Sequence, residues 1–221
     1  MGSITDLVTS LMVIFILFLV ATLTNKSKQQ ALVVRDLLSE LRAEFQSGGF
    51  NDENIKRDPK DPSLLLFIVP EKVMNFASNE SSLKPEGTAF IRSRVPQLAQ
   101  TLFEDRFRPH VEAIIVEGHT DRIRPRHLND LQGEQWNLRL SQDRSMEVVK
   151  QSLQSLEISP ELRRFFLDKL SANGRGESQP ALPDRPDAEE NRRVVFKIRI
   201  KPDLGGEMTA DLQQHGLKAA T

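Results

Sequence analysis

An acid and a base stand at the two ends of one predicted strand-loop-helix unit. The segment "VEGHTD" ends a predicted strand with Asp121, and "NLRLSQDR" carries Arg144 inside the predicted helix that follows. Such a pair can hold a zwitterion, because the carboxylate receives an ammonium and the guanidinium grips a carboxylate through two parallel hydrogen bonds. The same two residues could instead cap a helix or pair with each other, and spacing alone favours these structural roles.

A second candidate acid, Asp6, opens the apolar run "ITDLVTSLMVIFILFLVATL" at residues 4–23. A carboxylate drawn into a low-dielectric medium can take and release a proton, whereas at an aqueous interface it stays ionised. Thr9, three residues on and near the same helical face, could hydrogen-bond this carboxylate or a passing ion. Thr22 could do the same further along, although a solvated helix end is its simpler role. Asp is also a favoured N-cap, so position alone predicts that Asp6 caps the helix.

The apolar run is long enough to cross a bilayer. Leu7 to Leu23 carries no charge, and with its flanks it reaches about 20 residues, roughly 30 Å as a helix. Residues 1–24 are therefore predicted to form a short lead and one transmembrane helix. A cleaved signal peptide is the alternative, but no basic region precedes the run and Val20 to Leu23 matches a cleavage site poorly. Lys26 and Lys28 follow the helix, so the positive-inside count points weakly against an exported C-terminus.

Composition excludes several classes of protein. The chain has 221 residues with 30 Lys and Arg against 31 Asp and Glu, which leaves no field strong enough to imply a nucleic-acid partner. It has no cysteine, so disulfides and thiol catalysis are excluded. The four histidines lack metal-ligand spacing and are expected on the surface or in loops, and no nucleophile elbow or phosphate loop is present. The sequence predicts neither an enzyme nor a metal site nor a cofactor.

Between the membrane and the folded domain, residues 25–47 are predicted to form a juxtamembrane amphipathic helix. Apolar residues recur at alternating spacings of three and four, the a and d positions of a heptad; they are Ala31, Val34, Leu38, Leu41 and Phe45. So narrow a stripe could pair with a second copy in a coiled coil or lie on its own domain. Gly48 and Gly49 end the helix, and residues 48–62, polar and interrupted by prolines, are predicted to be a linker.

The folded domain is predicted to span residues 63–201. Its α+β pattern alternates strands with helices and places the helices on one side of a small sheet; strands are expected at 64–69, 111–118 and 194–201, and helices at 85–103 and 137–156. Pro96 is expected to kink or end the first helix. Residues 202–221, with glycines and weak patterning, are expected to form a loose tail.

Four segments of this domain resemble the OmpA-like peptidoglycan-binding domain, which also occurs in MotB-type motor proteins. They are "VEGHTD", "NLRLSQDR", "GRGESQP" and "NRRVVFKI", in the order and context of that family across residues 63–201. The resemblance implies a mixed sheet with helices on one side. It also implies that Asp121 and Arg144 bind the diaminopimelate of the peptidoglycan stem peptide. Further residues of the same motifs are expected to bind or support the ligand; they are Thr120, Asn137, Leu140, Ser141 and Arg192.

One loop departs from the family's pattern. The segment "RIRPRHLNDLQGEQW", residues 122–136, is longer and more basic than usual. It could alter access to the cell wall or contact another partner.

Residues 4–23 resemble the MotB segment in which an Asp begins the transmembrane helix. The resemblance implies a homodimer inside a pentameric ring of multi-span MotA-like subunits, with Asp6 carrying protons or sodium. It places the chain in the bacterial inner membrane, with the N-terminus cytoplasmic and the C-terminal domain periplasmic. The short lead before Asp6 leaves open a role in Zorya anti-phage defence instead of swimming. A passive tether between membrane and wall and a secreted wall-binding domain are the alternatives.

Overall fold

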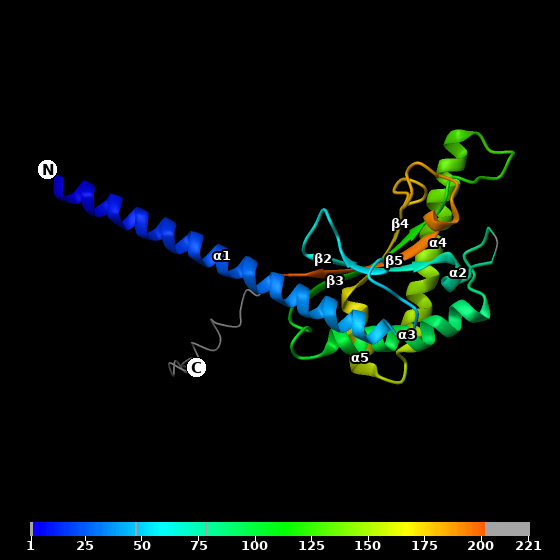
Figure 1. Cartoon of the computed structure of the whole chain (residues 1–221), viewed down its shortest axis with the longest axis horizontal. Coiled ribbons are helices and arrows are strands. Elements are labelled where there is room, and N and C mark those ends of the chain that lie inside the picture. The colour runs from blue at the N-terminus through cyan, green and yellow to red at the C-terminus, as the bar shows by residue number, and fades with distance from the viewer. Residues whose placement is uncertain (1, 47, 78, 202–221) are drawn as a thin grey trace, which may run out of the picture.

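A long N-terminal helix leads into a domain built on one sheet. The computed structural model describes residues 2–46, 48–77 and 79–201, so the predicted tail at 202–221 lies outside the described residues. Figure 1 shows helix α1 (Gly2–Gln46) projecting from the domain and then lying along it. The other helices are α2 (Glu71–Met74), α3 (Pro85–Phe103), α4 (Asp130–Ser155) and α5 (Pro160–Lys169).

The sheet is mixed and has five strands in the order β1-β2-β5-β3-β4. Neighbouring strands are antiparallel except for the parallel pair β3 and β4. The strands are β1 (Ile55–Arg57), β2 (Leu64–Pro70), β3 (Val111–His119), β4 (Leu170–Gly174) and β5 (Arg193–Ile200). This is the α+β class that the sequence predicts.

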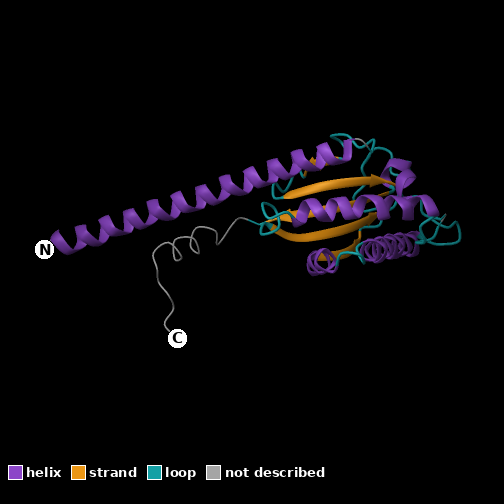
Figure 2. Ribbon diagram, turned by 90° about the horizontal axis from the view of Figure 1, so that it is seen from below, coloured by secondary structure: helices purple, strands orange, loops and turns teal. Residues whose placement is uncertain are grey.

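All the long helices cover the same face of the sheet. Helix α1 lies over β1 and β2, α4 and α5 lie over β3 and β4, and α3 lies between them (Figure 2). In β5 the alternation of the sequence sets which side chains face the helices, because successive residues of a strand point to opposite faces. Val194, Phe196, Ile198 and Ile200 are all buried in the core. Helices on one side of a mixed sheet were therefore predicted correctly.

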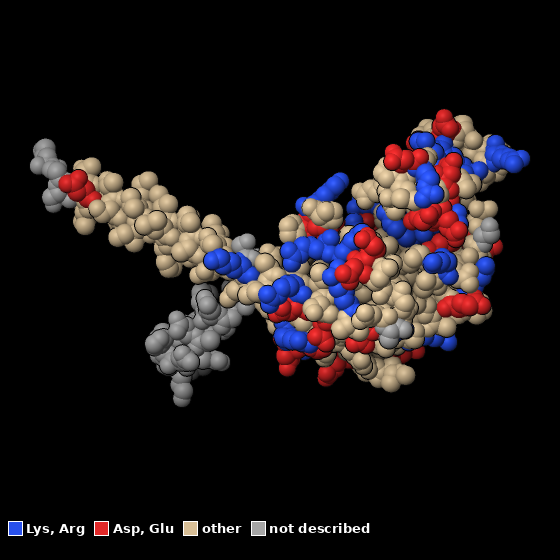
Figure 3. All heavy atoms as spheres, in the orientation of Figure 1, with Lys and Arg blue, Asp and Glu red and all other residues tan. Residues whose placement is uncertain are grey.

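Helix α1 has an exposed half and a buried half. Its N-terminal half is the one segment of the described residues long and apolar enough to cross a membrane, and none of that segment is buried. In Figure 3 this projecting part carries almost no charged side chain between its acidic start and the domain. The C-terminal half packs on the domain, where Val34, Leu37, Leu41 and Phe45 join the core. The sequence left two partners open for the apolar stripe of α1, a second copy of the chain or the chain's own domain. In the structure the stripe packs on the chain's own domain.

The segment predicted as a linker is part of the fold. Within residues 48–62, strand β1 pairs with β2, and Ile55 lies opposite Phe67. The ring of Phe50 meets those of Phe45 and Phe67 at 6.4 and 5.1 Å between centroids. Burial of these two apolar side chains outweighs the polar composition around them. The boundary at residue 63 was therefore wrong, because α1 and β1 share the core of the domain.

Helix α3 has the predicted bounds, but Pro96 does not end it early, and the start of α4 differs from the prediction. Helix α3 continues through Pro96 to Phe103, because the helix buries an apolar face that holds it on the sheet and on α4. Helix α4 begins seven residues before the predicted start at Asn137. Asn129 and Gln132 form a capping box there, which satisfies two backbone donors of the first turn.

Candidate functional site

The candidate site lies at the end of the sheet opposite to the point where α1 leaves it. Because β5 is antiparallel to both neighbours, its first residue, Arg193, lies opposite the last residues of β2 and β3, Pro70 and His119. The connections that follow these strands therefore meet at one edge. At the other end, Gln30 Nε2 of α1 donates to the carbonyl oxygen of Ile200 at 2.6 Å.

Helix α4 brings the "NLRLSQDR" residues to this edge through a close contact with β3. Gly118 permits the approach, because a Cβ there would collide with the carbonyl oxygen of Ser141. The Ser141 hydroxyl donates to the carbonyl oxygen of Leu138 and accepts from the backbone N–H of Gly176, both at 2.8 Å. Ser141 is fully buried. It therefore joins α4 to the segment after β4 and does not face a ligand.

Asp121 is held by two donors at the end of β3. One carboxylate oxygen accepts from the backbone N–H of Ile123 at 3.1 Å, and the other accepts from Arg192 Nη1 at 2.7 Å. The side chain of Asp121 is 6 % exposed and that of Arg192 is 30 % exposed. The predicted acid is thus paired with Arg192, which compensates its charge.

Arg144 is buried on α4, about two turns beyond Asn137 and about one turn beyond Leu140. Its Nε donates to the carbonyl oxygen of Glu80 at 2.9 Å, and its Nη1 lies 3.4 Å from Glu71 Oε2. The guanidinium stands over the ring of Phe76, 4.8 Å from the centroid, a cation–π geometry. Two of its donors therefore have protein partners, and the partner of the terminal nitrogen is a carboxylate that a ligand could replace.

Glu71 was missed by sequence reasoning. It directly follows β2 and is 15 % exposed. Burial raises the pKa of the Glu71 carboxyl, and the nearby guanidinium groups of Arg144 and Arg192 offset this only in part. The position of Glu71 could have indicated the site. A charged residue that directly follows a buried strand lies at the edge of the sheet, where the loops that form binding sites also lie.

Asp121 and Arg144 line one hollow of about 480 Å³. Glu71, Arg192 and Lys84 add further charges, and Phe76, Ile123, Trp136 and Leu140 form apolar parts of the wall. Thr120 and Asn137 line it as well. Within the described residues, Thr120 Oγ1 and Asn137 Oδ1 are buried without a hydrogen-bond partner. Buried polar atoms in proteins are normally paired, so these two are available to a polar ligand.

The unusual loop at 122–136 is fixed to the site. Arg124 Nη2 lies 2.6 Å from Glu177 Oε1, and Arg124 Nη1 donates to the carbonyl oxygen of Asp130 at 2.9 Å. Glu177 also accepts from Asn137 Nδ2 at 2.6 Å. The loop and the segment after β4 thereby support Asn137, and the loop supplies Ile123 to the wall of the hollow.

The predicted ion-carrying residues lie far from this hollow, on the projecting half of α1. Asp6 is exposed. The hydroxyls of Thr9 and Thr22 donate to the carbonyl oxygens of Thr5 and Phe18, both at 2.8 Å. Each threonine is thus bonded to its own helix in the single chain. The candidate ion-carrying residues therefore lie on the projecting half of α1, and the candidate peptidoglycan-binding residues lie at the edge of the domain.

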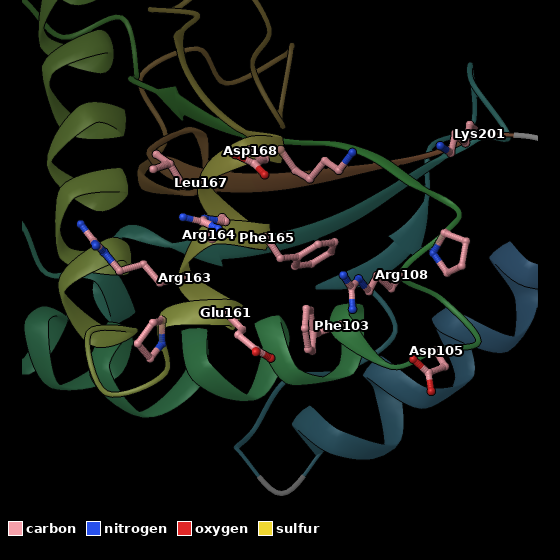
Figure 4. Close-up of a pocket in the computed structure, with 13 residues that line it drawn as sticks. Phe103, Asp105, Arg108, Glu161, Arg163, Arg164, Phe165, Leu167, Asp168 and Lys201 are labelled. Atoms are coloured by element: carbon pink, nitrogen blue, oxygen red, sulfur yellow. The ribbon is translucent and has the colours of Figure 1, made fainter. Parts of the chain in front are cut away.

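A larger hollow lies elsewhere and holds none of the predicted residues. It encloses about 1270 Å³ between the connection from α3 to β3 and helix α5, and Figure 4 shows Phe103, Arg108 and Phe165 on its walls. Among the described residues no group of three or more His, Asp or Glu could hold a metal ion. His119 is buried and not on the surface as predicted, and burial lowers the pKa of its imidazole.

Comparison with known proteins agrees with the fold. No protein-family profile and no curated protein sequence matches the chain. A MotB-like protein from Desulfovibrio vulgaris, solved by crystallography, has 23% sequence identity, covers 80% of this chain and 98% of its own, and superposes with a TM-score of 0.55. The domain therefore has the MotB-type, OmpA-like fold that the four sequence motifs predict.

Two further structures are similar at lower scores. The periplasmic domain of Helicobacter pylori MotB has 16% identity, covers 73% of this chain and 98% of its own, and has a TM-score of 0.49. The cell wall anchor of the T6SS from Pseudomonas aeruginosa has 20% identity, covers 74% and 97%, and has a TM-score of 0.45.

Proposed function

We propose that this chain is a non-enzymatic envelope anchor, which crosses the bacterial inner membrane once through α1 and binds the peptide stem of peptidoglycan in the hollow at the domain edge. The observation that carries the proposal is the pair Asp121 and Arg144, a buried acid and a buried base that line one hollow. Charged side chains are rarely buried to this degree, and buried charges of opposite sign that line one hollow are candidates for binding a charged ligand.

Diaminopimelate suits the hollow because its free end carries both an ammonium and a carboxylate. The ammonium would approach Asp121, and the carboxylate would approach the terminal nitrogens of Arg144. In the structure Asp121 is paired with Arg192, and Arg144 is paired with Glu71. A zwitterion brings one charge of each sign, so it can take over both pairings without changing the net charge of the hollow.

The position of the hollow suits an anchor to the wall. The apolar half of α1 lies at one end of the molecule, and α2 and α4 lie toward the other (Figure 1). Residues of α2 and of the first half of α4 line the hollow. With α1 in the inner membrane and the domain in the periplasm, the hollow would face away from the membrane. This orientation requires a cytoplasmic N-terminus, despite the lysines that follow the apolar run.

The finer proposal is an ion-driven motor subunit. Two copies of α1 would stand inside a pentameric ring of MotA-like subunits, and Asp6 would carry protons or sodium, with Thr9 and Thr22 nearby. The wall anchor would hold the subunit still while the ring turns, for swimming or for Zorya-type anti-phage defence. Its support is one carboxylate, Asp6, at the start of the apolar and exposed half of α1. The alternative is a passive tether, which would bind the wall through the same hollow and would conduct no ions.

Co-sedimentation with purified sacculi tests the anchor. The full chain in detergent should pellet with sacculi, whereas Asp121→Ala and Arg144→Ala should stay in the supernatant. Lys150→Ala is the matched control, because Lys150 lies on the same helix, lines neither the peptide hollow nor the hollow next to it, and has 61 % of its side chain exposed. Wild-type binding by both site variants would refute the wall assignment. A pull-down of the MotA-like partner separates the motor from the tether, and the N-terminal mass of the mature protein tests for a secreted form.

A further inference from the structure

An arginine of the loop at residues 122–136 is largely buried. The side chain of Arg124 is 15 % exposed, and its Nη2 lies 2.6 Å from Glu177 Oε1. Its Nη1 donates to the carbonyl oxygen of Asp130 at 2.9 Å and to the carboxylate of Asp130 at 3.1 Å. Gly133 leaves room for this side chain, because a Cβ at that position would collide with Arg124 Cδ. The loop is therefore folded around one buried cation.

Glu177 joins this arginine to helix α4. Its second carboxylate oxygen accepts from Asn137 Nδ2 at 2.6 Å. Asn137 is fully buried, and its Nδ2 also donates to the carbonyl oxygen of Asp121 at 3.2 Å. Both hydrogen atoms of that amide nitrogen are therefore used. One of them holds the backbone of the acid that lines the peptide hollow.

The charge of Glu177 determines how the Asn137 amide is turned. An asparagine side chain could present either its oxygen or its nitrogen to a neighbour, whereas an ionised carboxylate only accepts hydrogen bonds, so the nitrogen must face Glu177. Asn137 Oδ1 is then left without a partner within the described residues, on a side chain that lines the peptide hollow. Arg124 stabilises this arrangement, because burial of a carboxylate is unfavourable unless a cation compensates its charge.

We propose that Arg124 and Glu177 are positioning residues of the peptide site, which act on it through Asn137 and touch no ligand. Neither residue lines the peptide hollow. The relay, Arg124 to Glu177 to Asn137, would fix the amide that supports the backbone of Asp121 and leave Oδ1 turned toward the ligand. The inference rests on the proposed function. It gives the loop at residues 122–136 a role inside the domain, where it holds the acidic side of the site in place.

Calorimetric titration of the full chain in detergent with the diaminopimelate tripeptide tests the relay. Arg124→Gln keeps much of the side chain and removes its charge, so Glu177 should hold the Asn137 amide less firmly. Binding should weaken roughly two- to tenfold, which is the contribution of one neutral hydrogen bond. Arg124→Lys keeps the charge and should fall between Arg124→Gln and the wild-type chain.

Arg122→Gln is the matched control. Arg122 belongs to the same loop and its Nε lies 3.6 Å from the same oxygen of Glu177, but 61 % of its side chain is exposed. An exposed ion pair contributes little, so Arg122→Gln should bind the tripeptide as the wild-type chain does. Equal affinities of Arg124→Gln and Arg122→Gln would overturn the relay and leave the peptide site standing.

A double-mutant cycle separates a relay from two independent effects. In Glu177→Gln, Arg124 should attract the oxygen of the new amide, so that its NH₂ group faces Asn137 and turns the asparagine over. Binding should weaken about as much as in Arg124→Gln, and the double variant should lose no more than either single variant, because both residues act through one amide. Losses that multiply in the double variant would overturn the relay. No binding of the tripeptide by the wild-type chain would overturn the proposed function itself.

The Asn137 amide gives a readout that needs no ligand. Because Nδ2 is buried and donates at 2.6 Å to a carboxylate, its protons should exchange slowly with solvent in NMR spectra of the wild-type chain and of Arg122→Gln. Exchange should be faster in Arg124→Gln, with thermal unfolding as the check that each variant is folded. Equal exchange in Arg124→Gln and the wild-type chain would contradict the positioning role.

Discussion

Asp121→Asn removes one charge from the site with little change in shape. The asparagine oxygen can still accept the 3.1 Å hydrogen bond from the backbone N–H of Ile123, and Arg192, 30 % exposed, can turn toward water. The variant should therefore fold. Its hollow lacks the negative charge that would receive the ammonium of diaminopimelate, so binding should weaken while the fold persists.

The size of the loss follows from burial. The side chain of Asp121 is 6 % exposed, and a hydrogen bond to a charged group contributes about 1.5–3 kcal/mol. At about 1.4 kcal/mol for each factor of ten, Asp121→Asn should weaken binding of the diaminopimelate tripeptide roughly 10- to 150-fold. Calorimetric titration of the full chain in detergent measures this, with thermal unfolding as the check that the variant is folded.

A change in the ligand tests the role of Arg144. A tripeptide with lysine in place of diaminopimelate keeps the ammonium and lacks the carboxylate at that end. Wild-type chain should bind it more weakly than the diaminopimelate form, because Arg144 loses its partner. Arg144→Gln should bind the two peptides alike, since the coupling between residue and carboxylate is gone. Affinity of Asp121→Asn within twofold of wild type, or discrimination that persists in Arg144→Gln, would refute the zwitterion reasoning.

Three further predictions follow from the contacts. Because burial raises the pKa of Glu71, Glu71 should take up its proton at a higher pH than an ordinary glutamate, and this protonation should free Arg144 and tighten binding of the tripeptide as the pH falls. Glu71→Gln should bind more tightly at pH 7 and lose this dependence. An unchanged pH profile in that variant would contradict the role of Glu71. The same raised pKa means that the folded chain holds this proton more strongly than the unfolded chain, so ionisation of Glu71 lowers stability as the pH rises through its pKa. Phe45→Ala, at a fully buried site in the core, should destabilise the domain by about 3–5 kcal/mol, measured by denaturant unfolding, whereas no loss would mean that α1 is not docked in solution. Under the motor proposal, Asp6→Asn should abolish ion flux into vesicles that hold the chain with a MotA-like ring, while the complex still assembles. Equal flux in the wild-type chain and the variant would favour the tether.

Several features of the fold were accessible from the sequence because they are local. The alternation of Val194, Phe196, Ile198 and Ile200 specifies which face of β5 is buried, and Pro85 marks the first residue of α3. The capping box of Asn129 and Gln132 was also legible as an Asn followed three residues later by a Gln, and it gives the true start of α4.

The rest depends on contacts between residues distant in the chain. Strand β1 has three residues, two of them charged, and only its pairing with β2 makes it a strand. The site shows the same limit. The motifs single out Asp121 and Arg144, but the partner of each, Arg192 and Glu71, lies more than 70 positions away. No spacing rule can predict such pairs, because they form at the edge of the sheet where β2 and β3 end and β5 begins.

The most direct test of the anchor is a crystal structure of the folded domain, including the half of α1 that packs on it, with the diaminopimelate tripeptide. The account predicts the ammonium of diaminopimelate within hydrogen-bond distance of Asp121 and its carboxylate on the terminal nitrogens of Arg144, with Glu71 and Arg192 turned from their present partners. A tripeptide seated elsewhere, for example in the larger hollow beside α5, or one that leaves both existing ion pairs intact, would contradict it.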